Sequence, residues 1–288
     1  MILIFSCFLP MINFITIPLL TVAVIYLYVK LDLKRFLLVY LANILIMILI
    51  GGKIAFLLLS LPLFFLPAAI VMGFLYKKSF TAYKAIIASG LILVAEMIVL
   101  LIGMKLSGYD PFNYLKDNFN QMITLLPEGT IEPAAVESFF YMFQLISPFL
   151  MLFIGASYAF TSHALSRLIL PRMGESIPKL PSIQKLRLPR TTVIYFILVM
   201  LLSMFVDEQS GSILAMVAYN ILPVLTILLT LQALSLLFFV VHHFKWNRGI
   251  PWIAIVIVLF WSGWLYITVF VGMLDILFPL RARLTDKS

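Results

Sequence analysis

The chain has 288 residues, of which 64% are hydrophobic and only 11% are charged, and its formal net charge is +8. In a soluble domain about a quarter of the residues are charged. The composition therefore excludes a soluble domain. The basic residues flank apolar segments, which favours a protein in contact with a lipid bilayer over one that binds nucleic acid. The single cysteine, Cys7, excludes a disulfide within the chain and a multi-cysteine metal centre.

Long apolar segments predict an all-α integral membrane protein, a multi-pass helical bundle of about eight transmembrane helices. A bilayer core of about 30 Å needs about 20 apolar residues in helical conformation, and these runs lack the alternation of a membrane β-barrel. The predicted spans are Ile12–Val29, Phe36–Ile50, Ile54–Tyr76, Ala85–Met104, Phe139–Leu165, Thr192–Val206, Ile213–Val241 and Pro251–Leu274. We expect the shorter segment Met1–Leu9 to be a re-entrant stub or the end of a helix that begins upstream.

The distribution of Lys and Arg predicts the orientation in the membrane. One set of connections carries fourteen of them and the alternate set carries three, Lys53, Lys105 and Lys116. Since basic loops stay in the cytoplasm, we expect the first set inside, although the tail with Arg281 and Arg283 then falls outside. The fourteen residues are Lys30, Lys34, Arg35, Lys77, Lys78, Lys84, Arg167, Arg172, Lys179, Lys185, Arg187, Arg190, Lys245 and Arg248.

Three parts follow from this arrangement. Residues 1–106 form a first membrane part with four spans and the N-terminal stub, residues 107–138 an extracytoplasmic segment, and residues 139–288 a second membrane part with four spans. Within the last part, residues 167–190 form a basic cytoplasmic loop, which we expect to be extended because it holds four prolines. We find no clean internal repeat typical of inverted-repeat transporters.

The extracytoplasmic segment contains one predicted amphipathic helix. Asp110 and Pro111 are typical of an N-cap and a first helical position. Apolar residues then recur every three or four positions up to Leu126, and Pro127-Glu128-Gly129 ends the helix. We expect this helix to lie at the membrane interface or to cover the bundle as a lid; the alternative is a soluble extracellular subdomain. The apolar positions are Phe112, Leu115, Phe119, Met122, Ile123 and Leu126.

Glu96 is the one acidic residue well inside a predicted span, twelve residues after Lys84 and nine before Lys105. A charge near the bilayer midplane is costly, so an intramembrane carboxylate is a candidate functional residue. The alternative is a protonated or hydrogen-bonded structural carboxyl group.

Other polar residues inside the spans extend this candidate intramembrane polar site. Asn43, Asn220 and Gln232 either belong to such a site or form hydrogen bonds between neighbouring helices. His163 and the pair His242-His243 lack further ligands at metal-binding spacing. No nucleotide-binding loop or catalytic motif is present, so we expect neither an enzyme nor a cofactor, and an ATPase that supplies energy would have to be another chain.

Three short motifs in the second half resemble the YybS family of bacterial membrane proteins, whose function is not established. They are Leu186-Arg187-Leu188-Pro189-Arg190, Leu231-Gln232-Ala233-Leu234-Ser235 and a closing Gly-x-x-Asp-x-x-Phe-x-x-Arg pattern from Gly272 to Arg281. Two positions depart from the family pattern, because Leu186 stands where the family usually has Trp and Ala233 where it has Gly. The resemblance implies a fold similar to the substrate-binding S-components of energy-coupling-factor transporters.

The resemblance also implies a location in the bacterial cytoplasmic membrane, and two functional hypotheses follow. The first, implied by the resemblance, is a transport-related subunit that binds an unknown small molecule and docks on an energy-coupling module. The Ala-x-x-x-Ala docking motif typical of S-components does not occur in Met1–Val29. The second hypothesis is a non-transporting membrane scaffold or assembly factor. An outward-opening polar pocket favours transport, and a fully packed interior favours the scaffold.

Asp275 and Arg281 correspond to the closing acid and base of the family pattern. Six residues apart on one helix, they differ by 240° around its axis, and Pro279 interrupts the helix between them. We therefore expect each to meet a different partner and to fix the last span at the membrane interface. The alternative is that Asp275 belongs to a ligand site.

Overall fold

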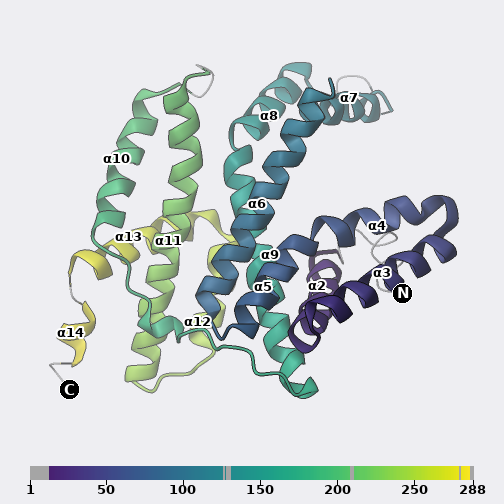
Figure 1. The fold of residues 1–288 in the computed structure, drawn as a ribbon. Coiled ribbons are helices and arrows are strands. Elements are labelled where there is room, and N and C mark those ends of the chain that lie inside the picture. The colour runs from purple at the N-terminus through teal and green to yellow at the C-terminus, as the bar shows by residue number, and fades with distance from the viewer. Residues whose placement is uncertain (1–12, 126, 128–130, 208–210, 279, 286–288) are drawn as a thin grey trace. The chain divides into compact units, whose positions relative to one another are not determined.

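The computed structural model describes residues 13–125, 127, 131–207, 211–278 and 280–285. All regular structure in these residues is helical (Figure 1), which confirms the all-α fold class. The segment Met1–Leu9 lies outside the described residues. Contacts divide the chain into two compact units, the first comprising Met1–Glu128 with Leu150–Leu180 and the second Gly129–Phe149 with Pro181–Ser288.

The first unit is built on the packing of α2 against α5 and of α5 against α6. Its core includes Ile25, Met72 and Ala85, which are each fully buried. Gly90 of α6 and Gly155 of α9 face each other, and a Cβ on Gly155 would lie 2.8 Å from the Gly90 carbonyl oxygen. The helices are α2 (Asn13–Lys30), α3 (Leu33–Gly51), α4 (Ala55–Phe64), α5 (Leu66–Lys77), α6 (Ala82–Leu106), α7 (Pro111–Ile123) and α9 (Ser147–Ile169), with short 3-10 turns at Gly52–Ile54 and Leu170–Met173. The helix α9 belongs to this unit from Leu150 onward, and its first turn belongs to the second unit.

The second unit is built around α11, which packs against α10 on one side and α13 on another (Figure 1). Val193, Leu225, Leu229 and Val269 form its apolar core. Its elements are α8 (Pro133–Leu145), the 3-10 turn η4 (Ile183–Lys185), α10 (Thr191–Phe205), α11 (Ile213–His243), α12 (Ile250–Phe260), α13 (Ser262–Leu277) and α14 (Leu280–Thr285).

Within the described residues, four helical segments are long and apolar enough to cross a membrane, Leu33–Ile54, Ala82–Leu106, Ser147–Met173 and Ile213–His243. Five shorter apolar helices accompany them, so the total of eight spans stays a prediction. Large apolar side chains point outward from the units, as expected where lipid is the solvent. Leu49 of α3 is 75% exposed and Phe260 of α12 is 86% exposed.

Three predicted spans are each divided into two helices, which corrects the expectation of single helices. Ile54–Tyr76 is interrupted at Phe65 between α4 and α5, and Phe139–Leu165 at Ile146 between α8 and α9. A proline stands just inside each following helix, Pro67 and Pro148, where its missing N–H costs least. Pro251–Leu274 is interrupted at Trp261, whose backbone is extended.

The predicted amphipathic helix is present as α7. The Asp110 carboxylate accepts hydrogen bonds from the backbone N–H groups of Phe112 at 2.9 Å and Asn113 at 3.3 Å, as expected of an N-cap. The helix ends earlier than expected, at Ile123, and Leu126 lies outside the described residues. None of the α7 side chains is buried.

Candidate functional site

Gln232, Asp275 and Arg281, three of the residues predicted for a polar site, come together in the second unit. The Gln232 side-chain Nε2 donates to Asp275 Oδ2 at 2.6 Å, and Arg281 Nη2 donates to the same oxygen at 2.7 Å. Arg281 Nε makes a further contact with this oxygen at 3.2 Å. We call Gln232, Ser235, Asp275 and Arg281 the clamp, since all four side chains are buried and bonded to one another or to backbone.

The pairing of Asp275 with Arg281 corrects the prediction that they meet different partners. The angular argument holds for one continuous helix, but α13 ends at Leu277 and Phe278 has an extended backbone. The Leu280 N–H donates to the Phe278 carbonyl at 2.6 Å, and α14 then begins. This turn brings Arg281 back to the end of α13. The distance between the Asp275 and Arg281 charges is therefore not determined by their six-residue separation along a helix.

The clamp also fastens the segment around η4 to α11. Arg281 Nη1 donates to the Gln184 carbonyl at 2.6 Å, and Ser235 Oγ donates to the Ile183 carbonyl at 2.6 Å. One turn earlier on α11, the Gln232 amide oxygen accepts from the Leu188 N–H at 3.0 Å. The three motifs quoted above for the YybS resemblance, far apart in the sequence, therefore meet in one hydrogen-bonded structure.

Gly272 allows α13 to approach α11 closely enough for the clamp to form. A Cβ at this position would overlap the Leu229 carbonyl oxygen. Asp275 follows one turn later and reaches Gln232, which is one turn after Leu229 on α11. The glycine in the closing motif is thus required by backbone contact.

Asn220 holds together the interrupted helix formed by α8 and α9 and is not part of the clamp. Its Oδ1 accepts from the Phe149 N–H at 2.8 Å, and its Nδ2 donates to the Leu145 carbonyl at 2.8 Å. The side chain therefore satisfies one backbone donor and one acceptor at the break. This arrangement matches the structural alternative of a hydrogen bond between neighbouring helices.

Glu96 lies in the first unit, on the α6 face that also buries Ser89 and Leu93. Both of its carboxylate oxygens are buried and have no hydrogen-bond partner among the described residues. Buried polar groups are usually paired. Because Glu96 lies in a candidate membrane span, it stays a candidate functional residue.

A buried contact between α5 and α9 escaped the sequence-based reasoning. The Tyr76 hydroxyl lies 2.6 Å from His163 Nδ1, and His163 is 1% exposed. Its other ring nitrogen, Nε2, is buried with no hydrogen-bond partner among the described residues. The sequence contains Tyr76 and His163 at a separation of 87 residues, and no local spacing links them.

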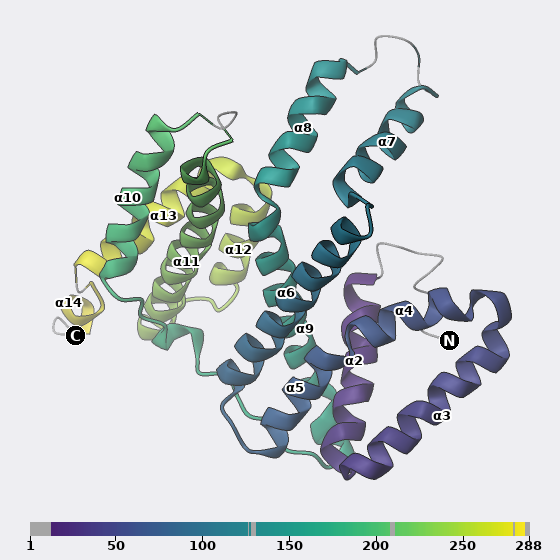
Figure 2. The same cartoon turned by 45° about the horizontal axis from the view of Figure 1, so that its top comes forward.

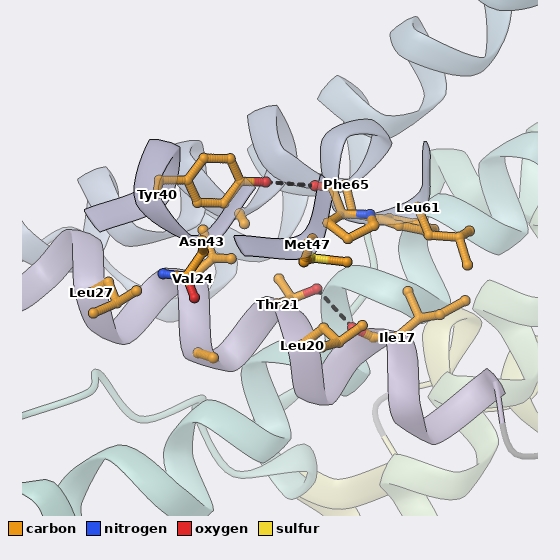
Figure 3. A pocket seen from close by; sticks show the side chains of 13 residues that line it. Ile17, Leu20, Thr21, Val24, Leu27, Tyr40, Asn43, Met47, Leu61 and Phe65 are labelled. Carbon is orange, nitrogen blue, oxygen red and sulfur yellow. Dashed lines mark hydrogen bonds between the residues drawn. The ribbon is translucent and has the colours of Figure 1, made fainter. Parts of the chain in front are cut away.

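Asn43 lines an apolar cavity of about 180 Å³ in the first unit (Figure 3). The helix α3 packs mainly along α4 and meets α2 at few positions (Figure 2). Asn43 Nδ2 donates to the Val39 carbonyl at 2.7 Å, while the Tyr40 hydroxyl donates to the Pro62 carbonyl. The lining residues are Ile17, Leu20, Thr21, Ala23, Val24, Leu27, Tyr40, Asn43, Met47, Leu61, Pro62, Phe65 and Ala69.

Comparison with known proteins places the chain in a family. A family model described as "Predicted membrane protein (DUF2232)" matches residues 1–276. The uncharacterized protein YybS of Bacillus subtilis (strain 168) is 21% identical over 226 residues, which are 75% of this chain and 73% of that protein. No solved structure matches the chain. The resemblance to YybS expected from the three motifs is confirmed.

Proposed function

The chain belongs to the DUF2232 family of predicted membrane proteins, and we propose that it is a transport-related subunit of the bacterial cytoplasmic membrane. In this proposal it binds a small, largely apolar molecule and carries out no chemistry on it. A separate energy-coupling module would supply the energy, in the manner of S-component transporters.

The cavity between α2, α3, α4 and α5 is the observation that supports the proposal. Ligand sites are concave and mostly apolar, with a few polar groups that orient the ligand. An apolar cavity of about 150 Å³ is large enough for benzene, so the 180 Å³ here suit a small ring or a short alkyl chain. Asn43 places an amide at this cavity, and its Oδ1 can accept a hydrogen bond from a bound ligand.

Filling the cavity tests the proposal. The variant Leu20→Trp places a large side chain in the cavity wall, whereas Leu45→Trp changes an exposed apolar residue on the same α3 helix that bears Asn43. Each protein is purified in mild detergent and its bound small molecules are identified by native mass spectrometry. We expect a small molecule on wild type and on Leu45→Trp, and its loss from Leu20→Trp. An identical set of bound molecules in all three proteins, or none on wild type, refutes the proposal.

A membrane scaffold or assembly factor is the second candidate, favoured by α7. Leu115, Phe119 and Met122 are exposed on one side of this helix, and such a face suits a partner protein as well as a lipid surface. The variant Phe119→Asp separates the two functions. If the variant loses a co-purifying membrane protein but retains the small molecule, the result supports the scaffold. If it retains both the membrane protein and the small molecule, the result supports transport alone.

A further inference from the structure

The second unit contains a polar pocket of about 780 Å³ at the end of α11. Its walls come from the last turns of α11, the connection to α12, the first turn of α12 and the turn η4. It is therefore distinct from the apolar cavity of the first unit. The lining residues are Gln184, Phe238, Val241, His242, Lys245, Trp246, Arg248, Pro251 and Trp252.

The charge of this pocket is positive. Lys245 and Arg248 line it, and no acidic side chain is among its lining residues. Neither side chain forms an ion pair or a hydrogen bond with the part of the chain that the structure describes. Two unpaired cations facing one concave space attract an anion, and basic pockets at the ends of membrane helices are known to take lipid phosphates.

The backbone conformation at Lys245 indicates independently that the charge of this lysine has a functional role. Lys245 has a φ of 53°, in the left-handed region, at the end of α11. The Trp246 N–H donates to the Val241 carbonyl at 2.9 Å, which closes the helix as in a Schellman motif. Glycine usually occupies this left-handed position, and strained residues cluster at functional sites. A lysine here places its charge at the pocket at a cost in backbone energy.

Aromatic side chains provide the apolar part of the pocket. Trp252 packs edge-on against Phe238, with ring centroids 6.0 Å apart, and Trp246 stacks on Phe244. Tryptophan is enriched at the level of lipid headgroups. A ligand with a phosphate and an apolar portion can therefore contact cations and aromatic rings together.

The clamp fixes one wall of the same pocket. Arg281 Nη1 donates to the Gln184 carbonyl at 2.6 Å, and Gln184 lines the pocket. The wall formed by η4 is thus held against α11 before any ligand binds. A preformed wall lowers the entropic cost of binding.

We propose that this pocket binds a phosphate group, held by Lys245 and Arg248, whose apolar portion packs on Trp246 and Trp252. This site goes beyond the proposed function, because it lies in the other unit and takes an anionic ligand. The phosphate comes from an anionic lipid headgroup or from a soluble phosphate compound, and the experiment distinguishes the two.

The test uses the full chain in nanodiscs of phosphatidylcholine with increasing fractions of phosphatidylglycerol. Bound lipid is counted by native mass spectrometry for wild type and for the double variant Lys245→Gln/Arg248→Gln. A control variant, Lys84→Gln/Arg172→Gln, removes two exposed charges outside the pocket. Each basic residue contributes about fivefold to binding, so we expect about 25-fold weaker phosphatidylglycerol binding in the pocket variant and wild-type binding in the control.

A second arm adds inorganic phosphate to the protein in pure phosphatidylcholine nanodiscs and follows tryptophan fluorescence. A saturable change that the pocket variant loses identifies soluble phosphate as the ligand source, whereas lipid binding without it identifies the headgroup. Equal lipid binding by wild type and pocket variant, equal loss in the control, or neither ligand bound by wild type would overturn the proposal.

The variant Lys245→Gly separates binding from folding. Glycine relieves the left-handed backbone, so we expect a thermal midpoint equal to or above wild type together with about fivefold weaker phosphate binding. Wild-type binding by this variant would show that the lysine side chain is not used.

Discussion

Arg281 Nη2 and Asp275 Oδ2 lie 2.7 Å apart, and the two side chains are only 4% and 2% exposed. Their ion pair joins α13 to α14 across the end of a helix. Through Gln184, Ser235 and Gln232 the same pair extends to η4 and α11. A single charged pair therefore fixes four separate elements of the second unit.

Removing one partner of this pair should destabilise the second unit strongly. In the variant Asp275→Asn the Arg281 charge stays buried without its counter-charge, which costs about 3–5 kcal/mol. Thermal unfolding in detergent measures the change. Ligand retention per folded molecule should be unaffected, because the clamp belongs to the second unit and the apolar cavity to the first.

The double variant Asp275→Leu/Arg281→Met provides the control. Apolar replacement of both charges removes the buried unpaired ion, so we expect part of the lost stability to return. Wild-type stability of Asp275→Asn would contradict the structural role of the clamp. Wild-type abundance combined with loss of ligand would place Asp275 in the binding site instead.

Gly272→Ala should destabilise the contact of α11 with α13. The new methyl group would overlap the Leu229 carbonyl oxygen, and forced overpacking costs about 1–3 kcal/mol. Gly263→Ala on the same helix meets no atom closer than 3.7 Å and should be neutral or slightly stabilising. The thermal unfolding midpoints of both variants in detergent measure these changes. Equal shifts of the midpoint in the two variants would contradict the close approach at Gly272.

Glu96→Gln should leave the stability of the first unit within about 1 kcal/mol of wild type. The amide has the same shape, and no described residue is hydrogen-bonded to the carboxylate. Ser89→Ala on the same face is the comparison, because its hydroxyl donates to the Ala68 carbonyl at 2.9 Å and its loss costs about 1 kcal/mol. If Glu96→Gln unfolds more readily than Ser89→Ala, the carboxylate has a structural role.

The orientation predicted from the basic residues can be tested by cysteine labelling of intact cells. In a protein without Cys7, a cysteine at Asn120 should react with an impermeant reagent and one at Ser182 should not. Both positions are exposed in the structure, so neither is protected by folding. Labelling at Ser182 but not at Asn120 would reverse the orientation.

Local patterns in the sequence predicted local structure well. The Asp110-Pro111 start of α7 depends on an N-cap bond to residues two and three positions away, and helical spacing identified its apolar face. Hydropathy did not reveal the breaks at Phe65, Ile146 and Trp261, because apolar composition continues across them. A single proline or one extended residue decides whether an apolar run forms one helix or two. Hydropathy averaged over a whole span does not detect such a residue.

The candidate site was predictable only as single residues. Gln232, Asp275 and Arg281 were each identified, but their meeting depends on the turn after Leu277 and on the close approach at Gly272. The Tyr76–His163 contact and the basic pocket around Lys245 depend on residues brought together by packing. Motif spacing within one chain segment contains no information on such contacts.

The Asn220 bridge has a consequence for the synthesis of the protein. The backbone groups at Leu145 and Phe149 leave the ribosome 71 to 75 residues before the side chain that satisfies them. An unpaired backbone group in lipid costs several kcal/mol, so the joint between α8 and α9 can reach its final geometry only after α11 has been inserted. A nascent chain that stops before Asn220 should therefore be recognised by membrane quality-control proteases at this joint, and the variant Asn220→Leu should delay maturation of an otherwise complete chain.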